Sequence, residues 1–184
     1  MPNIASRLGQ IFWGLVLVAA DIRVRTFDIL PDFVGYILVA VGLGGLLSAS
    51  RHFGLARLLS WILVPVSAGA VLFHGNFGMI LRLAQVPLDG AMIWFLCGGL
   101  IEMAQSRQRA DLVSRAALCR VAYVALLGVI AAIGLTARIL PSVASALSAL
   151  TLLAVLCVVV VLLHLLYEVK RMTTTEAPVS PAQA

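Results

Sequence analysis

Charged side chains are scarce in this sequence. Only 11% of the 184 residues are Asp, Glu, Lys or Arg, whereas 62% are hydrophobic, and the mean hydropathy is +1.08. A soluble domain has roughly 25% charged residues, and a chain of this size has too little interior to bury so much apolar surface. The composition therefore excludes a soluble globular fold and predicts an integral membrane protein in which lipid covers the apolar surface.

Motifs for several common chemistries are also missing. The sequence contains no G-x-x-x-x-G-K-[ST], no H-E-x-x-H and no G-x-S-x-G, so energy coupling, zinc proteolysis and nucleophile-elbow hydrolysis lack support. The cysteines at 97, 119 and 157 have no metal-pair spacing and are odd in number, which favours packing roles over a metal site or a disulfide framework. His52 and His164 could approach each other and hold a haem between two helices, but interfacial histidines that only form hydrogen bonds are commoner. We expect no metal and no cofactor.

Six apolar runs separated by polar connections predict the architecture. We expect helices over 4–20, 31–50, 56–73, 87–103, 118–136 and 142–167, forming one all-α transmembrane domain over 1–172, with a disordered tail over 173–184. The first run is short enough to imitate a signal peptide, with Val18-Ala19-Ala20 as a small-residue cleavage site. Because apolar residues flank its centre, we interpret it as a retained first helix.

Basic residues predict the orientation of this polytopic helix bundle. With the N-terminus inside, nine of the thirteen basic residues fall in the inner segments: Arg7, Arg51, Arg57, Arg107, Arg109, Arg115, Arg120, Lys170 and Arg171. This excess favours both termini in the cytoplasm. The six helices then form three helical hairpins that turn at the outer face, and Pro31, Pro87 and Pro141 begin the inward-going helices.

Ionisable residues are absent from the centres of the six predicted helices. Proton relays and ion-coupled transporters normally keep such groups there despite the cost of burying them in a membrane. The sequence therefore argues against a proton-driven or sodium-driven carrier. The net charge of +5 comes from basic residues between apolar runs, which favours contact with membrane lipids over binding of nucleic acid.

The outer connection between the first two predicted helices is the best candidate for a polar site. It brings together six side chains: Asp21, Arg23, Arg25, Asp28, Asp32 and Tyr36. Since residues four apart share a helix face, Asp32 and Tyr36 are expected to project together toward the outer interface, where the cluster could bind a headgroup, an ion or a partner. The alternative is structural: the acids cap the second helix, the arginines neutralise them, and Tyr36 anchors the interface.

The stretch from Asp28 to Tyr36 reads D-I-L-P-D-F-V-G-Y. It resembles a D-I-L-P-D-F-x-G-Y motif of uncharacterised small multi-pass bacterial membrane proteins, in which it opens the second helix after a short turn of acidic and basic residues. The resemblance covers Ala20 to Leu47 and implies a bacterial inner-membrane setting with this topology. It implies no activity and no catalytic residue.

Small residues on two predicted helices suggest how the chain packs. They are Ala40, Gly44 and Gly45 on the second helix and Ser145 and Ala149 on the sixth. Such faces let helices approach closely, so the sequence favours a non-enzymatic accessory, assembly or structural component of the inner membrane that docks on itself or on a larger complex. The first alternative is a small-solute transporter or lipid-interacting protein that uses the outer polar cluster. The second is a membrane enzyme acting on a lipid.

Overall fold

The computed structural model describes residues 4–20, 23–24, 27–28, 32–73, 75–136 and 141–175. It contains six helices: α1 (Ile4–Ala20), α2 (Asp32–Gly44), α3 (Arg51–Leu72), α4 (Asn76–Gln105), α5 (Ala110–Thr136) and α6 (Pro141–Thr175). Two short antiparallel strands, β1 (Arg23–Val24) and β2 (Phe27–Asp28), lie between α1 and α2. The prediction of an all-α bundle with six helices is therefore confirmed.

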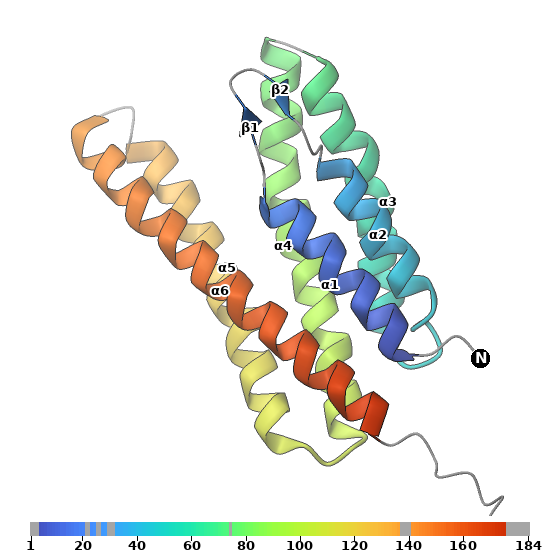
Figure 1. The fold of residues 1–184 in the computed structure, drawn as a ribbon. Helices are drawn as coiled ribbons and strands as arrows, with labels where there is room; N and C mark the ends of the chain where they lie inside the picture. The colour runs from blue at the N-terminus through green and yellow to red at the C-terminus, as the bar shows by residue number, and fades with distance from the viewer. Residues whose placement is uncertain are drawn as a thin grey trace, which may run out of the picture.

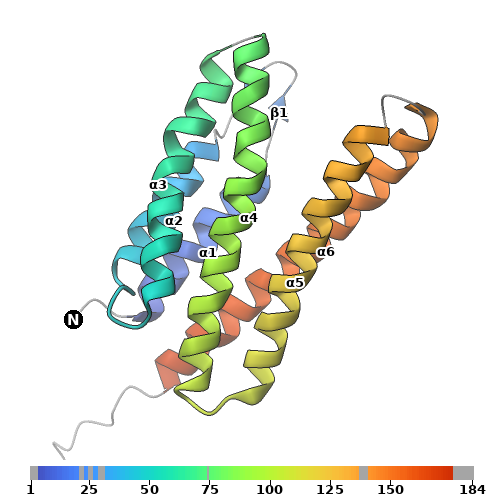
Figure 2. The same ribbon diagram turned by 180° about the vertical axis from the view of Figure 1, so that it is seen from behind.

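Consecutive helices pack side by side, and α1 also packs against α6, so contacts run around the whole bundle. Figures 1 and 2 show that α1 starts and α6 ends at the same end of the molecule, together with the α2–α3 and α4–α5 connections. The β-hairpin and the α3–α4 turn lie at the opposite end. The α2 and α4 helices therefore run in the same direction, which matters for the contacts between them.

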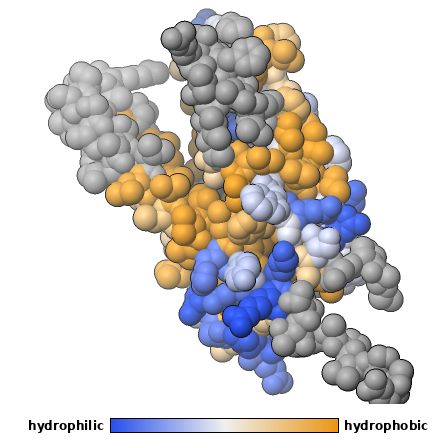
Figure 3. Space-filling model, viewed as in Figure 1, coloured by the Kyte–Doolittle hydropathy of each residue, from blue (hydrophilic) through white to orange (hydrophobic). Residues whose placement is uncertain are grey.

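Membrane spanning is supported by helix length and composition. Four helical segments are long and apolar enough to cross a membrane: Arg51–Leu72, Asn76–Gln105, Ala110–Ile130 and Leu153–Met172. The apolar helices α1 and α2 are shorter, at 17 and 13 residues, or about 25 and 20 Å at 1.5 Å per residue. Figure 3 shows hydrophobic residues over the middle of the described surface and hydrophilic ones gathered at the end where α1 starts and α6 ends.

The largest difference from the predicted boundaries is at α4. It begins at Asn76, so Pro87 lies inside the helix rather than at its start. A proline inside a membrane helix removes one backbone hydrogen bond but is tolerated there, and the stretch from Met79 to Val86 is apolar enough to continue the helix. Similarly, α3 begins at Arg51 and α5 at Ala110, ahead of the predicted residues 56 and 118. The α6 helix extends to Thr175, so residues 173–175 of the predicted disordered tail are helical, and the rest of that tail lies outside the described residues.

The second predicted helix, by contrast, ends early. α2 stops at Gly44 and continues as tight turns to residue 49, in which backbone N–H groups donate to the carbonyl three residues back, as from Gly45 to Gly42 and from Leu46 to Leu43. Adjacent glycines favour this change because their backbones are unrestrained. Ser50 then accepts a hydrogen bond from the backbone N–H of His52 at 3.0 Å and caps the start of α3.

Small residues of α2 face the chain's own helices. Ala40 is fully buried. A Cβ atom on Gly45 would lie 2.6 Å from Cγ of Arg7 in α1, and one on Gly44 would lie 3.4 Å from Cζ of Arg57 in α3. These positions thus admit long side chains from neighbouring helices. The side chains of Ser145 and Ala149, the other two predicted packing residues, lie outside the described part of α6.

The α5–α6 pair is set at an angle to the rest. In both ribbon views the two helices lean away from α1–α4 toward the end where the β-hairpin lies. Exposed apolar side chains cover α4 in that half, including Phe77, Met79, Ile80 and Leu83. The α4 helix packs against α3, and these four side chains form an exposed apolar surface on this half of it.

Candidate functional site

A tyrosine and an aspartate meet between α2 and α4. Tyr36 is completely buried, and its hydroxyl donates a hydrogen bond of 2.7 Å to Oδ1 of Asp89. Tyr36 forms part of the main apolar core, so its ring is held by packing while its hydroxyl reaches the carboxyl group. The contact connects two helices that are 53 residues apart in the sequence.

Gln85 extends this contact to a second acid. Its Nε2 donates to the Tyr36 hydroxyl oxygen at 3.1 Å and lies 3.4 Å from Oδ2 of Asp32. The pairs Asp32/Tyr36 and Gln85/Asp89 are each four residues apart on their helices, so each pair occupies one helix face. Since α2 and α4 run in the same direction, the two faces meet in register. We call these four residues the α2–α4 cluster.

The position of Asp89 along α4 is the notable feature of this cluster. The helix extends from Asn76 to Gln105, so at 1.5 Å per residue Asp89 lies about 20 Å from one end and about 24 Å from the other. Asp89 is thus far from both ends of α4, whereas its partner Tyr36 lies only four residues from the start of α2. The sequence places Asp89 in the first turn of a helix that begins at Pro87, and the earlier start of α4 corrects that position.

A second ionisable side chain lies inside the bundle on α5. The guanidinium carbon of Arg120 is 3.4 Å from the centroid of the Trp94 ring of α4, a cation–π contact. Arg120 lies ten residues from the start of α5, or about 15 Å along it. The sequence placed this arginine among the inner-face charges because the fifth helix was expected to begin at residue 118.

Tyr123 of α5 lies near both Arg120 and the acid Asp89. It lies three residues after Arg120 on α5 and close enough to Asp89 for the two to interact electrostatically. On the other side of Arg120, the thiol of Cys119 donates a weak hydrogen bond of 3.9 Å to the backbone carbonyl of Val158 on α6. Polar groups of α2, α4 and α5 thus follow one another along the interior, an acid nearer the hairpin end and a guanidinium nearer the end where α1 starts.

The outer cluster predicted from the sequence is only partly described. Asp21 and Arg25 lie outside the described residues. Arg23 and Asp28 are opposite each other in the β1–β2 pair, a register that suits opposite charges, although their side chains lie outside the described set. Asp32 and Tyr36 share a helix face as expected, and the residues that sequence reasoning missed are their partners on α4, Gln85 and Asp89.

The two histidines considered for haem belong to different helix pairs. His52 Nδ1 lies 2.9 Å from Oε1 of Glu102, between α3 and α4. His164 Nε2 lies 3.3 Å from Oε1 of Glu168, which also accepts from Arg115 of α5. Each histidine thus has an acid as its neighbour.

The connection between α4 and α5 carries a separate ion pair. Arg109 donates to both carboxylate oxygens of Asp111, at 3.0 and 2.9 Å. The carboxylate raises the pKa of the Arg109 guanidinium above its ordinary value, chiefly through this hydrogen bonding. Both residues are exposed, so the pair fixes the turn and contributes little to stability.

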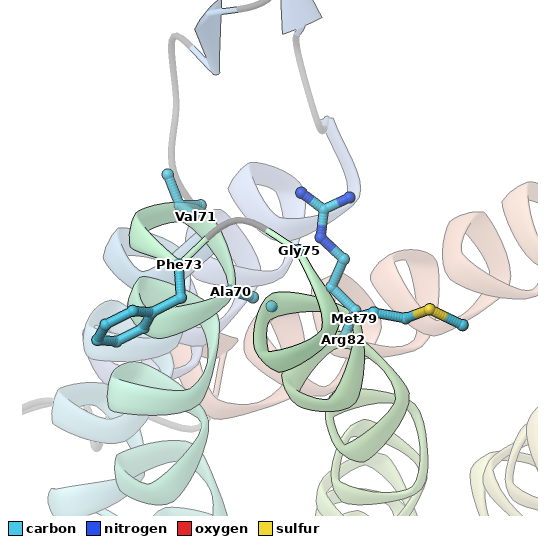
Figure 4. A pocket seen from close by; sticks show the side chains of 7 residues that line it. Ala70, Val71, Phe73, Gly75, Met79 and Arg82 are labelled. Carbon is cyan, nitrogen blue, oxygen red and sulfur yellow. The ribbon is translucent and has the colours of Figure 1, made fainter.

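A pocket of about 270 Å³ lies at the hairpin end, where α3 turns into α4. Figure 4 shows its lining, which consists of Ala70, Val71, Phe73, Gly75, Gly78, Met79 and Arg82. The Arg82 side chain extends toward the same end as the β-hairpin. Arg82 precedes Gln85 by three residues on α4, so a basic group stands between the hairpin end and the α2–α4 cluster.

Comparison with known proteins found no matching family model, no similar curated protein and no similar solved structure. The function is therefore argued from the geometry of the chain itself.

Proposed function

We propose that the protein is a small-solute carrier of a bacterial inner membrane and that the α2–α4 cluster, with Tyr123 and Arg120, lines its polar path. The observation that carries this proposal is the 2.7 Å hydrogen bond between Tyr36 and Asp89 at the middle of α4. Ionisable side chains are costly inside a membrane, and where they occur they commonly mark substrate or ion paths.

The backbone near Asp89 supports the same interpretation. Pro87 lies two residues before Asp89 and cannot donate to the carbonyl of Leu83. Carriers often place their binding groups beside interrupted helices, because a freed carbonyl adds a polar group to the site. In this proposal Asp89 and Arg120 bind the charged parts of the solute, and Tyr36 and Gln85 orient the acid.

The sequence favours an accessory role because of small helix faces for docking and a lack of ionisable side chains at the helix centres. The structure differs from both expectations. Ala40 of α2 is fully buried, and Gly44 and Gly45 lie against Arg57 and Arg7 of the chain's own helices. The interior also contains ionisable side chains, at Asp89 and Arg120. A lipid enzyme is less favoured, because Asp89 and Asp32 are hydrogen-bonded to Tyr36 and Gln85 respectively.

Water accessibility of the path tests this proposal without knowledge of the solute. In a background in which the three natural cysteines are replaced by alanine, Gln85→Cys and Tyr123→Cys are each treated in membrane vesicles with a charged, water-soluble methanethiosulfonate reagent. A carrier must open its path to one side of the membrane, so both variants are expected to react. Leu83→Cys is the matched control, because Leu83 is exposed toward lipid on α4.

Reaction at Gln85 and Tyr123 with none at Leu83 supports the carrier. Absence of reaction at both positions in protein that elutes as a single folded species contradicts it. In that case a fixed partner protein, recovered by purification in a mild detergent, would support the accessory role instead.

A further inference from the structure

A groove between α1 and α6 has the features of a lipid site. It has a volume of about 240 Å³ and is lined by Gly9, Phe12, Trp13, Leu166, Tyr167 and Lys170. Pockets that enclose a whole small molecule measure roughly 300–1000 Å³. The groove is smaller than this, so it suits part of a long molecule whose remainder lies in the bilayer.

The polar end of the groove is basic. Gly9 has no side chain, and a Cβ atom placed there would lie 3.3 Å from Nζ and 3.8 Å from Cε of Lys170, so the lysine extends across the glycine. Lys170 lies five residues from the end of α6, and Gly9 five residues from the start of α1, about 7.5 Å along each helix. The ammonium group is thus at the depth where a headgroup meets hydrocarbon.

The rest of the lining is aromatic or apolar. Trp13 and Tyr167 are 62% and 56% exposed, and such amphipathic rings are enriched at membrane interfaces. Leu166 is buried at the floor of the groove, and Phe12 packs edge-on against Trp13 with ring centroids 5.6 Å apart. A cationic group at one end and aromatic carbon along the groove match an anionic molecule with an apolar chain.

Charges around the groove favour an anion. Arg7, two residues before Gly9 on α1, is basic, and it donates to Gln10 at 3.0 Å. The acid on this part of α6, Glu168, is bound to Arg115 of α5 at 3.1 Å and so is turned toward α5 rather than α1. From this arrangement we infer that the groove binds one anionic phospholipid of the leaflet around the start of α1 and the end of α6, with its phosphate at Lys170 and an acyl chain along Trp13 and Leu166.

The full chain, purified in a neutral detergent, provides the test. It is mixed with equal amounts of phosphatidylglycerol and phosphatidylcholine of identical acyl chains, and the lipid retained is measured by native mass spectrometry. One basic residue near an anionic headgroup changes affinity about fivefold. We expect the wild type to retain one phosphatidylglycerol with at least this preference, and Lys170→Gln to lower the preference to about that of a neutral site.

Changes elsewhere in the groove provide further variants. Gly9→Leu is expected to reduce retention of phosphatidylglycerol, because the added side chain would displace the Lys170 ammonium group, which lies 3.3 Å from a Cβ atom at position 9. Trp13→Ala is expected to weaken retention of both lipids by removing the aromatic wall. Arg171→Gln and Trp61→Ala are matched controls for charge and for an exposed tryptophan outside the groove. Both should bind as the wild type does.

Two results overturn the inference. One is wild-type retention in folded Lys170→Gln and Gly9→Leu proteins, since the lipid would then lie elsewhere. The other is displacement of the lipid by excess inorganic phosphate alone, which would make the site one for free anions. The inference does not depend on the carrier proposal, because the groove lies between α1 and α6, away from the α2–α4 cluster.

Discussion

At the scale of single residues, Tyr36 of α2 provides the hydrogen-bond partner of Asp89 on α4. Its ring packs with the apolar core, and its hydroxyl is the polar group that reaches Asp89 from α2. Asp89 is half-buried, and an acid that is partly removed from water costs less when it has a hydrogen-bond partner. Tyr36 therefore makes it possible for α4 to hold an aspartate at its middle.

The coupling between these two residues can be measured. We expect Tyr36→Phe and Asp89→Asn each to lower the free energy of unfolding, and the double variant to cost less than the sum of the two. Coupling between polar groups in membrane bundles averages about 0.6 kcal/mol and reaches about 1.7 kcal/mol, and we expect a value in this range. The measurement is reversible unfolding in mixed micelles, analysed as a double-mutant cycle.

Tyr167→Phe, at an exposed tyrosine of α6, serves as the control for that cycle. Additive effects of Tyr36→Phe and Asp89→Asn, with no coupling above experimental error, would mean that the hydrogen bond contributes nothing to the fold.

The sequence identified half of the α2–α4 cluster. Asp32 and Tyr36 were recognised because they stand close to other charges in a short outer connection. Gln85 and Asp89 do not stand out in the sequence, because they lie on either side of Pro87, the predicted start of the fourth helix. Their spacing of four residues, the same as that of Asp32 and Tyr36, was the available signal, but sequence alone does not show that α2 and α4 lie in register.

At the scale of elements, α1 and α2 meet through two glycines. A Cβ atom on Gly35 would lie 2.7 Å from the carbonyl oxygen of Gly14, and one on Gly14 would lie 2.8 Å from that of Gly35. The two backbones are therefore in direct contact, which only glycine permits at both positions. This contact joins the two shortest helices of the bundle.

Adding one methyl group at this contact should separate the helices. Gly35→Ala is expected to destabilise the protein by about 1–3 kcal/mol, the usual cost of overpacking. Gly128→Ala is the control on α5, where nothing lies within 4 Å of an added Cβ, so the change should be neutral or stabilising by up to about 1 kcal/mol. Thermal unfolding in detergent compares the two, and equal stability of both variants would contradict a close α1–α2 contact.

The predicted and observed ends of the helices differ more than the number of helices does. Proline was taken as a starting residue because it favours the first turn, and this holds at Pro141, where α6 begins. It does not hold at Pro87, because eleven residues before it are apolar enough to continue the helix and polar groups of α2 are close by. The number of helices follows from hydropathy alone, whereas their ends depend on neighbours.

At the scale of the whole molecule, charge differs between the two ends. Basic residues gather at the end where α1 starts: Arg107 and Arg109 lie in the α4–α5 connection, and Arg51 is the first residue of α3. Excess Lys and Arg retain a segment in the cytoplasm. We accordingly propose that this end faces the cytoplasm and that the β-hairpin faces the periplasm.

Reporter fusions test this orientation. Alkaline phosphatase, active only outside the cytoplasm, is expected to be active when fused after Phe73, in the α3–α4 turn, and inactive when fused after Arg109. Green fluorescent protein fused after residue 184 should fluoresce. The reverse pattern of phosphatase activity would show the opposite orientation.

The contact between α1 and α6 has a consequence for how the protein is made. It joins the first and last helices, which are separated by the 120 residues between Ala20 and Pro141. At roughly 5–20 residues per second of synthesis, α1 waits about 6–24 seconds for this partner. During that interval the groove-forming face of α1 is open to other chains in the membrane. This face therefore most needs protection during biogenesis in the period before α6 arrives.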